Sequence, residues 1–518
     1  MQSKKIAIVG GGASGIFASI GAGLASKGRQ GVEIIIFESN RAIGKPILRS
    51  GNGRCNLSNK KIKDDEALSL LKSRGLLTET KDTGEIFPYT NKAQTVLDLC
   101  TELLDECGVK VETEHTIDGL DQLRDFDSKI ICTGHHTKEG LLPQGYDFFD
   151  FELVLCPIEV EEKDISSLNN LRAKCLVTVK DDLGVVIFEE YGEVQFREYG
   201  LSGIVIFNAS RYSRQGDIIE LNFKPKDMSV SEFQAKIKER LEIASNYEGI
   251  VAKEISDYLL EHNTNPASLT FSVARLHDDP KLVQVYRGGI PKKSAYDFST
   301  MTFVCGEALD YDGPCGGFNI SHAFNSGLET GRLVAEFLLA EEALRDGRVV
   351  GLPTDTVYGI GVSVKHASSK AIINEIKGSA LDKPIAWLIA EESDLERYAT
   401  NIPDYVAELT SEGWPGGLTI ILQANDNVPE NFRSSSNTVA LRMPNSQLVR
   451  ELARRIDSPI AASSANYSGQ PALKSYADVG PSLLNKLSAT IRGINSTSSG
   501  IASTIIDCTG DIPVVIRT

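Results

Sequence analysis

The chain has 518 residues, enough for several hydrophobic cores and, at about 150 residues each, for about three domains. Hydrophobic residues make up 41% and charged residues 24%, a composition typical of folded proteins that excludes disorder as the main state. The formal net charge of −16 argues against a protein that coats nucleic acid. DNA is therefore not expected as a partner, although a local basic site remains open.

Nine cysteines are scattered along the chain, and no Cys-x-x-Cys pair occurs. An odd number with this spacing indicates reduced thiols in a cytoplasmic protein, rather than a disulfide framework or a zinc site. No apolar run approaches the roughly 18 residues of a membrane span, and the N-terminus lacks a signal-peptide pattern. We therefore expect no membrane partner and no metal site.

A glycine-rich loop near the N-terminus lies between two predicted strands. Residues 5–9 predict a buried strand, residues 10–15 read Gly-Gly-Gly-Ala-Ser-Gly, and residues 16–27 predict a helix. The second strand, residues 32–37, is followed directly by Glu38. This order of strand, Gly-x-Gly-x-x-Gly turn, helix, strand and acid predicts a dinucleotide site.

Each residue of this motif has an expected task. Gly10 makes the tight turn, Gly12 lets a pyrophosphate approach the backbone, and Gly15 lets the helix pack on the strand. The helix N-terminus favours negative charge, and Glu38 can hold a ribose hydroxyl. The alternative is a glycine-rich turn in an ordinary α/β unit, and these residues alone do not choose between NAD and FAD.

Two further polar, glycine-rich stretches, residues 49–59 and 305–319, flank a long intervening region. The second leads into a predicted helix at about residues 318–342. A distant segment that returns to the same fold suits a long cofactor with two ends. Cys55 is expected to be a packed thiol, and the pair at 135–136 to be loop histidines rather than metal ligands.

These segments resemble the BaiN-type (YhiN-type) family of NAD(P)- and FAD-dependent flavoproteins. The resemblance covers about residues 1–340 and rests on the glycine loop and on residues 50–59, 87–88, 192–203 and 306–319. It implies a Rossmann-like α/β domain that binds FAD and is built from two parts, residues 1–150 and 286–340. Residues 151–285 would be inserted β-rich and helical modules on the substrate side, and NAD(P)H would be the electron donor.

The resemblance also implies which residues hold the flavin. The helix that begins after Gly317 would direct its positive end at the pyrimidine edge of the ring and stabilise the reduced, anionic flavin. The cofactor-binding set comprises Gly10, Gly12, Gly15, Glu38, Arg54, Asn56, Gly134, Gly306, Glu307, Gly316, Gly317, Phe318 and Asn319.

The last third of the chain has a second series of polar motifs. Residues 338–347 predict a helix, with no flexible linker before the predicted strand at 348–352. Lys, Arg, Ser, Thr and Asn then gather at predicted strand ends, without a nucleophile–base pair. Such a set binds and orients a phosphate-rich ligand, and the alternative is a polar-loop α/β domain without a ligand.

This series resembles the YrdC family of threonylcarbamoyl-AMP synthases over about residues 340–517. The most specific motif is Pro-Thr-Asp-Thr-Val-Tyr-Gly at 353–359. The resemblance implies a twisted, largely parallel α/β domain, residues 341–518, with a basic cavity. Its nucleotidyltransferase reaction would join L-threonine, bicarbonate and ATP, with Mg²⁺, and release pyrophosphate. The product serves the t6A modification of tRNA, so tRNA, double-stranded RNA more broadly and t6A-pathway proteins are candidate partners.

The residues carried over from this family fall into two groups. The predicted catalytic residues are Lys377, Lys383 and Arg442. The predicted substrate-binding residues are Thr354, Thr356, Tyr358, Ser464, Asn466 and Ser503. Thr356 and Tyr358 are expected at threonine, whereas Lys377, Lys383, Ser464 and Asn466 are expected at ATP.

The pattern departs from the family at one important position, because the usual Lys-x-Arg reads Lys377-Gly378-Ser379. An arginine aimed at phosphate is missing, although Arg433 or Lys383 could replace it. Three hypotheses therefore stand: a bifunctional fusion with two activities, an active flavoprotein carrying a silent nucleotide- or RNA-binding module, and an interaction scaffold without turnover.

Overall fold

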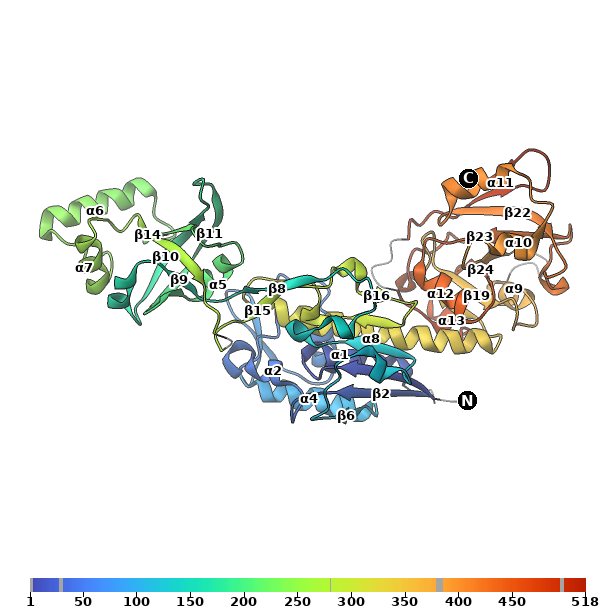
Figure 1. Ribbon diagram of the computed structural model, residues 1–518, viewed down its shortest axis with the longest axis horizontal. Helices are drawn as coiled ribbons and strands as arrows, with labels where there is room; N and C mark the ends of the chain where they lie inside the picture. Colours follow the sequence, from blue (N-terminus) through green and yellow to red (C-terminus); the bar gives the residue numbers. More distant parts are fainter. Residues whose placement is uncertain (1–2, 28–30, 280, 379–384, 494–497) are drawn as a thin grey trace.

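The computed structural model describes residues 3–27, 31–279, 281–378, 385–493 and 498–518. Three lobes follow one another along the long axis of the molecule (Figure 1). A barrel lies at one end, a mainly parallel sheet with its helices lies in the centre, and a large mixed sheet lies at the other end. This mixed α/β architecture confirms the predicted fold class at its general level.

The central sheet has the strand order β16-β17-β7-β1-β2-β6. Its strands are β1 (Lys4–Val9), β2 (Val32–Phe37), β6 (Lys110–Glu112), β7 (Ser128–Ile131), β16 (Tyr296–Asp297) and β17 (Thr302–Val304). All neighbours except β16 and β17 run parallel. Ile6 and Ile8 belong to one buried cluster and Ala7 and Val9 to another, so β1 is covered on both faces, as a parallel strand requires.

Two helices contact one face of this sheet and pack against each other. They are α1 (Ala13–Ser26) and α8 (Phe318–Arg345), and their backbones approach at glycines. A Cβ at Gly331 would lie 1.8 Å from the carbonyl oxygen of Ala18, and one at Gly327 would lie 2.2 Å from that of Ser14. The shorter elements beside them are α2 (Lys45–Arg49), α3 (Glu66–Ser73), α4 (Ala93–Glu106), β3 (Ser58–Asn59), β4 (Thr78–Thr80) and β5 (Glu85–Pro88).

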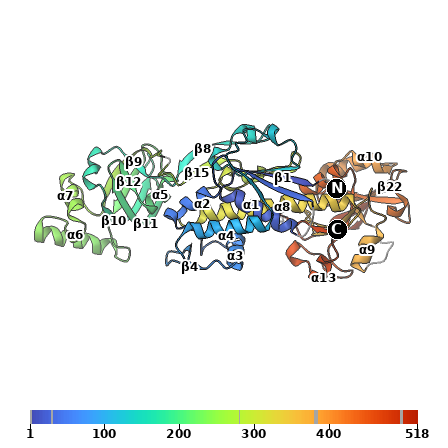
Figure 2. The same ribbon diagram turned by 90° about the horizontal axis from the view of Figure 1, so that it is seen from below.

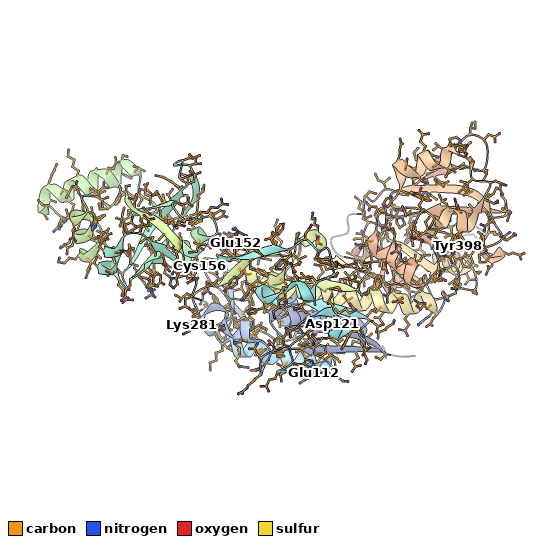
Figure 3. The ribbon with its side chains drawn as sticks, viewed as in Figure 1. Glu112, Asp121, Glu152, Cys156, Lys281 and Tyr398 are labelled. Atoms are coloured by element: carbon orange, nitrogen blue, oxygen red, sulfur yellow. The ribbon has the colours of Figure 1, made fainter. Side chains whose placement is uncertain are left out.

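A closed six-stranded barrel forms the lobe at one end of the molecule. It is joined to the central lobe by a two-stranded ribbon of β8 (Phe149–Val154) and β15 (Val285–Gly289). Figure 3 shows Glu152 and Cys156 where this ribbon meets the barrel. The barrel strands are β9 (Ile158–Val160), β10 (Arg172–Lys180), β11 (Val186–Arg197), β12 (Gly200–Ser202), β13 (Ile218–Asn222) and β14 (Leu269–Leu276). Its helices are α5 (Ile204–Ser210), α6 (Val230–Ala244) and α7 (Lys253–Glu261).

The C-terminal sheet has the order β25-β18-β19-β24-β20-β23-β22-β26-β27, with β21 beside β22. Its strands are β18 (Val350–Leu352), β19 (Gly359–Ser363), β20 (Ala386–Leu388), β21 (Ala399–Thr400), β22 (Leu418–Ala424), β23 (Thr438–Arg442), β24 (Ile460–Ser464), β25 (Ala489–Thr490), β26 (Thr504–Asp507) and β27 (Val514–Arg517). Its helices are α9 (Ala371–Lys377), α10 (Asp394–Tyr398), α11 (Tyr405–Gly413), α12 (Gln447–Arg455) and α13 (Pro481–Leu484).

The expectation of a largely parallel sheet in this lobe is wrong. Among the described strands only the pairs β25–β18, β20–β23 and β22–β26 are parallel, and the remaining neighbours are antiparallel. Strand direction depends on how connections cross the sheet, which local patterns do not reveal.

Helix α8 belongs to both the central and the C-terminal lobes. It runs continuously through the predicted boundary near residue 340 and ends beneath the C-terminal sheet, as both views show (Figures 1 and 2). Its residues Leu338 and Leu344 share one buried cluster with Ile16 of α1 and with Val449 and Ile491 of the C-terminal lobe. The two lobes are thus packed around one common core. Within the described chain, no helix combines the length and apolar character that a membrane crossing needs.

Candidate functional sites

The glycine loop after β1 shows which glycines the fold itself requires. Gly10 has φ +103°, and a Cβ there would lie 2.6 Å from the oxygen of Cys132, while a Cβ at Gly15 would lie 1.9 Å from the oxygen of Gly10. Gly12 has φ −76°, and its Cβ would only make an ordinary contact with Pro46 at 3.5 Å. Because no protein atom excludes a side chain at Gly12, this glycine fits close approach by a ligand.

Glu38 closes the loop from the end of β2. Its side chain is 7% exposed, and one carboxylate oxygen accepts a hydrogen bond from the amide of Gly11 at 2.7 Å. The other oxygen accepts from the amide of Asn40 at 2.7 Å. The predicted ribose acid therefore lies directly beside the glycine loop.

The structure brings residues 56 and 317 together, as the two-part site predicts. With the Asn56 amide oriented to satisfy its hydrogen bonds, its oxygen accepts from the amide of Gly317 at 3.1 Å. A Cβ at Gly317 would lie 2.3 Å from the oxygen of Ser58. Gly316 is held as well, because its carbonyl accepts from the Asn59 amide at 2.9 Å. The N-terminus of α8 is thus anchored beside the 50–59 segment.

Gly306 and Glu307 lie between the glycine loop and the ribbon. A Cβ at Gly306 would lie 2.3 Å from the hydroxyl of Ser14 on α1. The Glu307 carboxylate accepts from the amide of Tyr286 at 3.1 Å and lies 3.3 Å from Nδ1 of His135. A Cβ at Gly134 would lie 3.1 Å from the same carboxylate. These predicted residues therefore form one contiguous group.

Other predicted flavin residues have structural partners. The Asn319 amide closes its own loop, with bonds of 2.7 and 2.8 Å to the amide and carbonyl of Gly313. The guanidinium of Arg54 lies 4.9 Å from the ring centre of Phe87. Phe318 is half-buried at the first position of α8. Cys55 is fully buried, and burial raises the pKa of its thiol to about 11, so it is a packed thiol as predicted.

Sequence reasoning missed the polar network that fixes the start of α8. Asp65 caps α3 and also accepts hydrogen bonds from Ser321 at 2.8 Å and from Asn325 at 2.9 Å, both on α8. From the barrel, Arg211 pairs with Asp312 at 2.8 Å. No local signal marks these contacts, because their partners lie 256, 260 and 101 residues apart.

His322, one turn into α8, carries a buried ring nitrogen, Nε2, without a hydrogen-bond partner among the described residues. Its ring stacks on Tyr311 at 3.8 Å. A buried polar atom without a partner is costly unless a ligand completes it. The unpartnered nitrogen near the start of α8 and the open space at Gly12 are two separate features that fit a bound dinucleotide cofactor.

Burial, and then the charge of Lys292, lowers the pKa of His322 to about 4. Since an unfolded histidine titrates near 6.5, acidification protonates the unfolded chain first, and stability is lost as pH falls from 6.5 toward 4. We expect the free energy of unfolding to drop by about 2 kcal/mol more, between pH 7 and 5, in the wild type than in His322→Phe. Urea unfolding at both pH values measures this difference, and equal losses in the two proteins would contradict it.

The C-terminal site begins at the Pro-Thr-Asp-Thr motif between β18 and β19. Arg442, only 6% exposed, donates to the Thr356 hydroxyl at 2.8 Å, to the Asp355 carboxylate at 2.5 Å and to the Gly416 carbonyl at 2.9 Å. The Thr354 hydroxyl lies 3.1 Å from that of Thr356. Burial lowers the pKa of Arg442. Arg442 therefore fixes the motif, a task that sequence reasoning did not assign to it.

Lys377 and Ser464, both predicted at ATP, are neighbours. The buried ammonium of Lys377 donates to the Ser463 hydroxyl at 2.7 Å, to the Ser464 carbonyl at 2.6 Å and to the Ser464 hydroxyl at 3.2 Å. Asn466 follows, with its Oδ1 buried and without a partner in the described parts of the chain. The amide of Ala465 donates to the Tyr358 carbonyl at 2.8 Å, which joins this group to the threonine motif.

Ser503 lies immediately before β26 and has two neighbours that sequence reasoning missed. Its hydroxyl is 2.8 Å from that of Thr419, and its carbonyl accepts from Arg517 at 2.7 Å. The charge of Arg517 also reaches Arg442, whose pKa it lowers further after burial. Arg517 thus adds positive charge to this side of the site.

The remaining positions named in the sequence analysis have different outcomes. Tyr358 is fully buried, and its hydroxyl donates to the Ile491 carbonyl at 2.8 Å, so it supports the motif from within the core. Lys383 and Ser379 lie outside the described residues. The guanidinium of Arg433 donates to the carbonyls of residues 425 and 428 and to Asn437. Among the described residues, no group of three or more His, Cys, Asp or Glu is placed to hold a metal.

Comparison with known proteins found relatives of both the N-terminal and the C-terminal part of the chain. The family model for Sua5, YciO and YrdC, described as "Telomere recombination", matches residues 342–518. The threonylcarbamoyl-AMP synthase of Pyrococcus abyssi is 36% identical over 35% of this chain and 52% of its own length. A putative threonylcarbamoyl-AMP synthase of Mycobacterium leprae is 34% identical, over 34% of this chain and 80% of its own.

A solved structure of Pyrococcus abyssi Sua5 with L-threonine has 36% identity and a TM-score of 0.34, covering 35% of this chain and 53% of that chain. A 3-dehydro-bile acid delta(4,6)-reductase of Clostridium scindens is 27% identical over 64% of this chain and 99% of its own length. The chain spans about half the length of the first synthases that it matches. The chain therefore belongs, through residues 342–518, to the Sua5/YciO/YrdC family of threonylcarbamoyl-AMP synthases, and its N-terminal region is homologous to a bile-acid reductase.

Proposed function

We propose that the chain is a bifunctional fusion. The C-terminal part makes threonylcarbamoyl-AMP from L-threonine, bicarbonate and ATP, and the N-terminal part is an FAD-dependent NAD(P)H oxidoreductase. The observation that carries the first activity is the convergence of Thr356, Arg442, Lys377 and Ser464 at neighbouring strand ends. The second activity is supported by the glycine loop, Glu38 and the anchored N-terminus of α8.

The proposed synthesis needs positioned charge rather than a covalent enzyme intermediate. The amine of threonine takes up bicarbonate with loss of water, and an oxygen of the resulting carbamate displaces pyrophosphate from the α-phosphate of ATP. Lys377 places its ammonium where it can neutralise phosphate charge, and Mg²⁺ would arrive with the phosphates. The unpartnered Oδ1 of Asn466 accepts a hydrogen bond from ATP, and the hydroxyl of Thr356 orients threonine.

FAD, when bound, supplies hydride transfer from NAD(P)H to an acceptor, for which the family resemblance suggests an activated C=C bond. The N-terminus of α1 would hold the pyrophosphate, and Glu38 would accept a hydrogen bond from a ribose hydroxyl. The positive end of α8, anchored at Gly317, would stabilise the reduced flavin.

A direct test incubates the full chain with ATP, L-threonine and bicarbonate and follows pyrophosphate release and threonylcarbamoyl-AMP. Absence of both products would refute the synthase activity and favour the alternative of a catalytically silent module. The serine at position 379, where the family has arginine, is the reason for that alternative. Under that alternative, Ser379→Arg does not restore synthesis. For the other half, the visible absorption spectrum of the pure protein should show bound flavin that NADPH bleaches without oxygen, and a colourless protein that takes up no FAD would refute it.

Gly12→Ala should separate flavin binding from folding. The new Cβ meets only Pro46, at 3.5 Å, so we expect the thermal midpoint of the apoprotein to stay within about 2 °C of the wild type. The same Cβ blocks the approach of a pyrophosphate to the backbone, so the Kd for FAD should rise at least about tenfold. Flavin fluorescence titration measures the Kd, and unchanged affinity would contradict the proposed site.

A further inference from the structure

Helix α8, which begins at the proposed flavin site, also contacts the C-terminal lobe. Glu336 on this helix is 6% exposed. One of its carboxylate oxygens accepts from the backbone amide of Arg492 at 2.8 Å, and the other pairs with the Arg492 guanidinium at 3.1 Å. A carboxylate of the N-terminal half thus holds both the main chain and the side chain of one residue in the C-terminal half.

The residues on either side of Arg492 support the threonine motif. The carbonyl of Ile491 accepts from the hydroxyl of Tyr358 at 2.8 Å. Gly493 has φ +83°, and a Cβ there would lie 3.0 Å from Cβ of Pro353. Two residues of the motif, Pro353 and Tyr358, therefore lie directly beside residues 491–493.

A second set of contacts leads from Arg492 to the same tyrosine. The Arg492 guanidinium lies 5.2 Å from the ring centre of Tyr476, and that ring meets the Tyr358 ring edge-on at 6.2 Å. Burial raises the pKa of Tyr358, and the charge of Glu336 raises it further. The charge of the α8 carboxylate therefore reaches the tyrosine of the motif.

We propose that Glu336 is a positioning residue for the threonine side of the C-terminal site, supplied by the helix of the N-terminal half. This inference rests on the proposed synthase function. Loss of the carboxylate charge leaves the Arg492 guanidinium without its partner and loosens residues 491–493. The Thr356 segment then shifts relative to ATP, and small misplacements of a substrate-orienting group weaken productive binding.

The chain offers a matched control in Glu341, which is 2% exposed and lies on the same helix. It pairs with Arg455 of α12 at 2.9 Å and with Arg345 at 3.1 Å. The pair with Arg455 also joins α8 to the C-terminal lobe. The two arginine partners of Glu341 lie on α12 and at the end of α8, however, and not in segment 491–493. A merely structural role for ion pairs of buried α8 carboxylates at this junction would make Glu336 and Glu341 equivalent.

The test compares the full chain with its Glu336→Gln and Glu341→Gln variants in steady-state synthesis of threonylcarbamoyl-AMP. We expect Glu336→Gln to raise the KM for L-threonine about tenfold with an unchanged KM for ATP, and Glu341→Gln to change neither. Arg492→Met removes the same ion pair from the other side, so it should raise the same KM, and the double variant should add little.

An active wild type in which Glu336→Gln leaves the KM for threonine unchanged, or in which both glutamine variants change it equally, would overturn this inference alone. Wild-type protein that makes no threonylcarbamoyl-AMP would overturn the proposed synthase function together with it. Thermal unfolding of each variant shows whether a lost activity reflects lost folding. If Glu336→Gln does not fold, Arg492→Lys, which keeps the charge pair, should show a near wild-type KM, and a raised KM would count against the proposal.

Discussion

Arg442→Met should reduce threonylcarbamoyl-AMP formation by about 100-fold or more. The substitution removes the three hydrogen bonds that hold Asp355, Thr356 and Gly416 around the motif, and it removes buried positive charge from the site. One lost electrostatic donor alone can cost ~10²–10³ in rate. It also leaves the Asp355 carboxylate, 14% exposed, without its partner, so we expect a loss of about 3–5 kcal/mol in unfolding free energy.

The two effects can be separated. The double variant Arg442→Met with Asp355→Asn removes the uncompensated charge, so it should recover most of the thermal stability while synthesis stays low. Arg433→Met is the matched control, because Arg433 binds carbonyls of its own loop and should not affect the rate. Near-normal synthesis by folded Arg442→Met would show that the arginine has no part in the reaction.

Gly331→Ala should destabilise the protein, although alanine is the better helix former by about 1 kcal/mol. The added Cβ would lie 1.8 Å from the carbonyl oxygen of Ala18, so α1 and α8 must separate. Overpacking of this kind costs about 1–3 kcal/mol or more. Because α8 lies in the common core of two lobes, we expect flavin binding and threonylcarbamoyl-AMP synthesis to fall together.

Differential scanning calorimetry and the two activity assays measure this outcome. Gly12→Ala serves as the control for the thermal midpoint of the apoprotein only, since its Cβ has room and its φ suits alanine. A Gly331→Ala protein with an unchanged or raised thermal midpoint would contradict the close helix contact. Loss of one activity with the other intact would contradict the shared role of α8.

The parts of the fold that follow from local rules could be predicted from the sequence. The strand at 32–37 matches β2, and the glycine loop occurs at its predicted place because turn geometry and helix packing select glycine at positions 10 and 15. The predicted helix at 16–27 begins three residues earlier, at Ala13. The two helices predicted at 318–342 and 338–347 are one, since no residue between them breaks the helix.

What could not be predicted depends on contacts between distant residues. Arg517 reaches Ser503 only because β27 turns back along β26, and Glu336 meets Arg492 across 156 residues. The catalytic role predicted for Arg442 did not include its contacts with the motif, because a catalytic arginine and a motif-fixing arginine look identical in sequence. Side-chain partners, rather than residue types, distinguish the two tasks.

The placement of α8 has a consequence for biosynthesis. Helix α1 leaves the ribosome early, yet the helix that covers it follows roughly 300 residues later, and β17 must still insert beside β7. At a synthesis rate of about 5–20 residues per second, the apolar side of α1 stays exposed for tens of seconds until α8 has been made. We therefore expect the nascent chain to expose this apolar surface during elongation, whereas its last third folds against a helix that is already made.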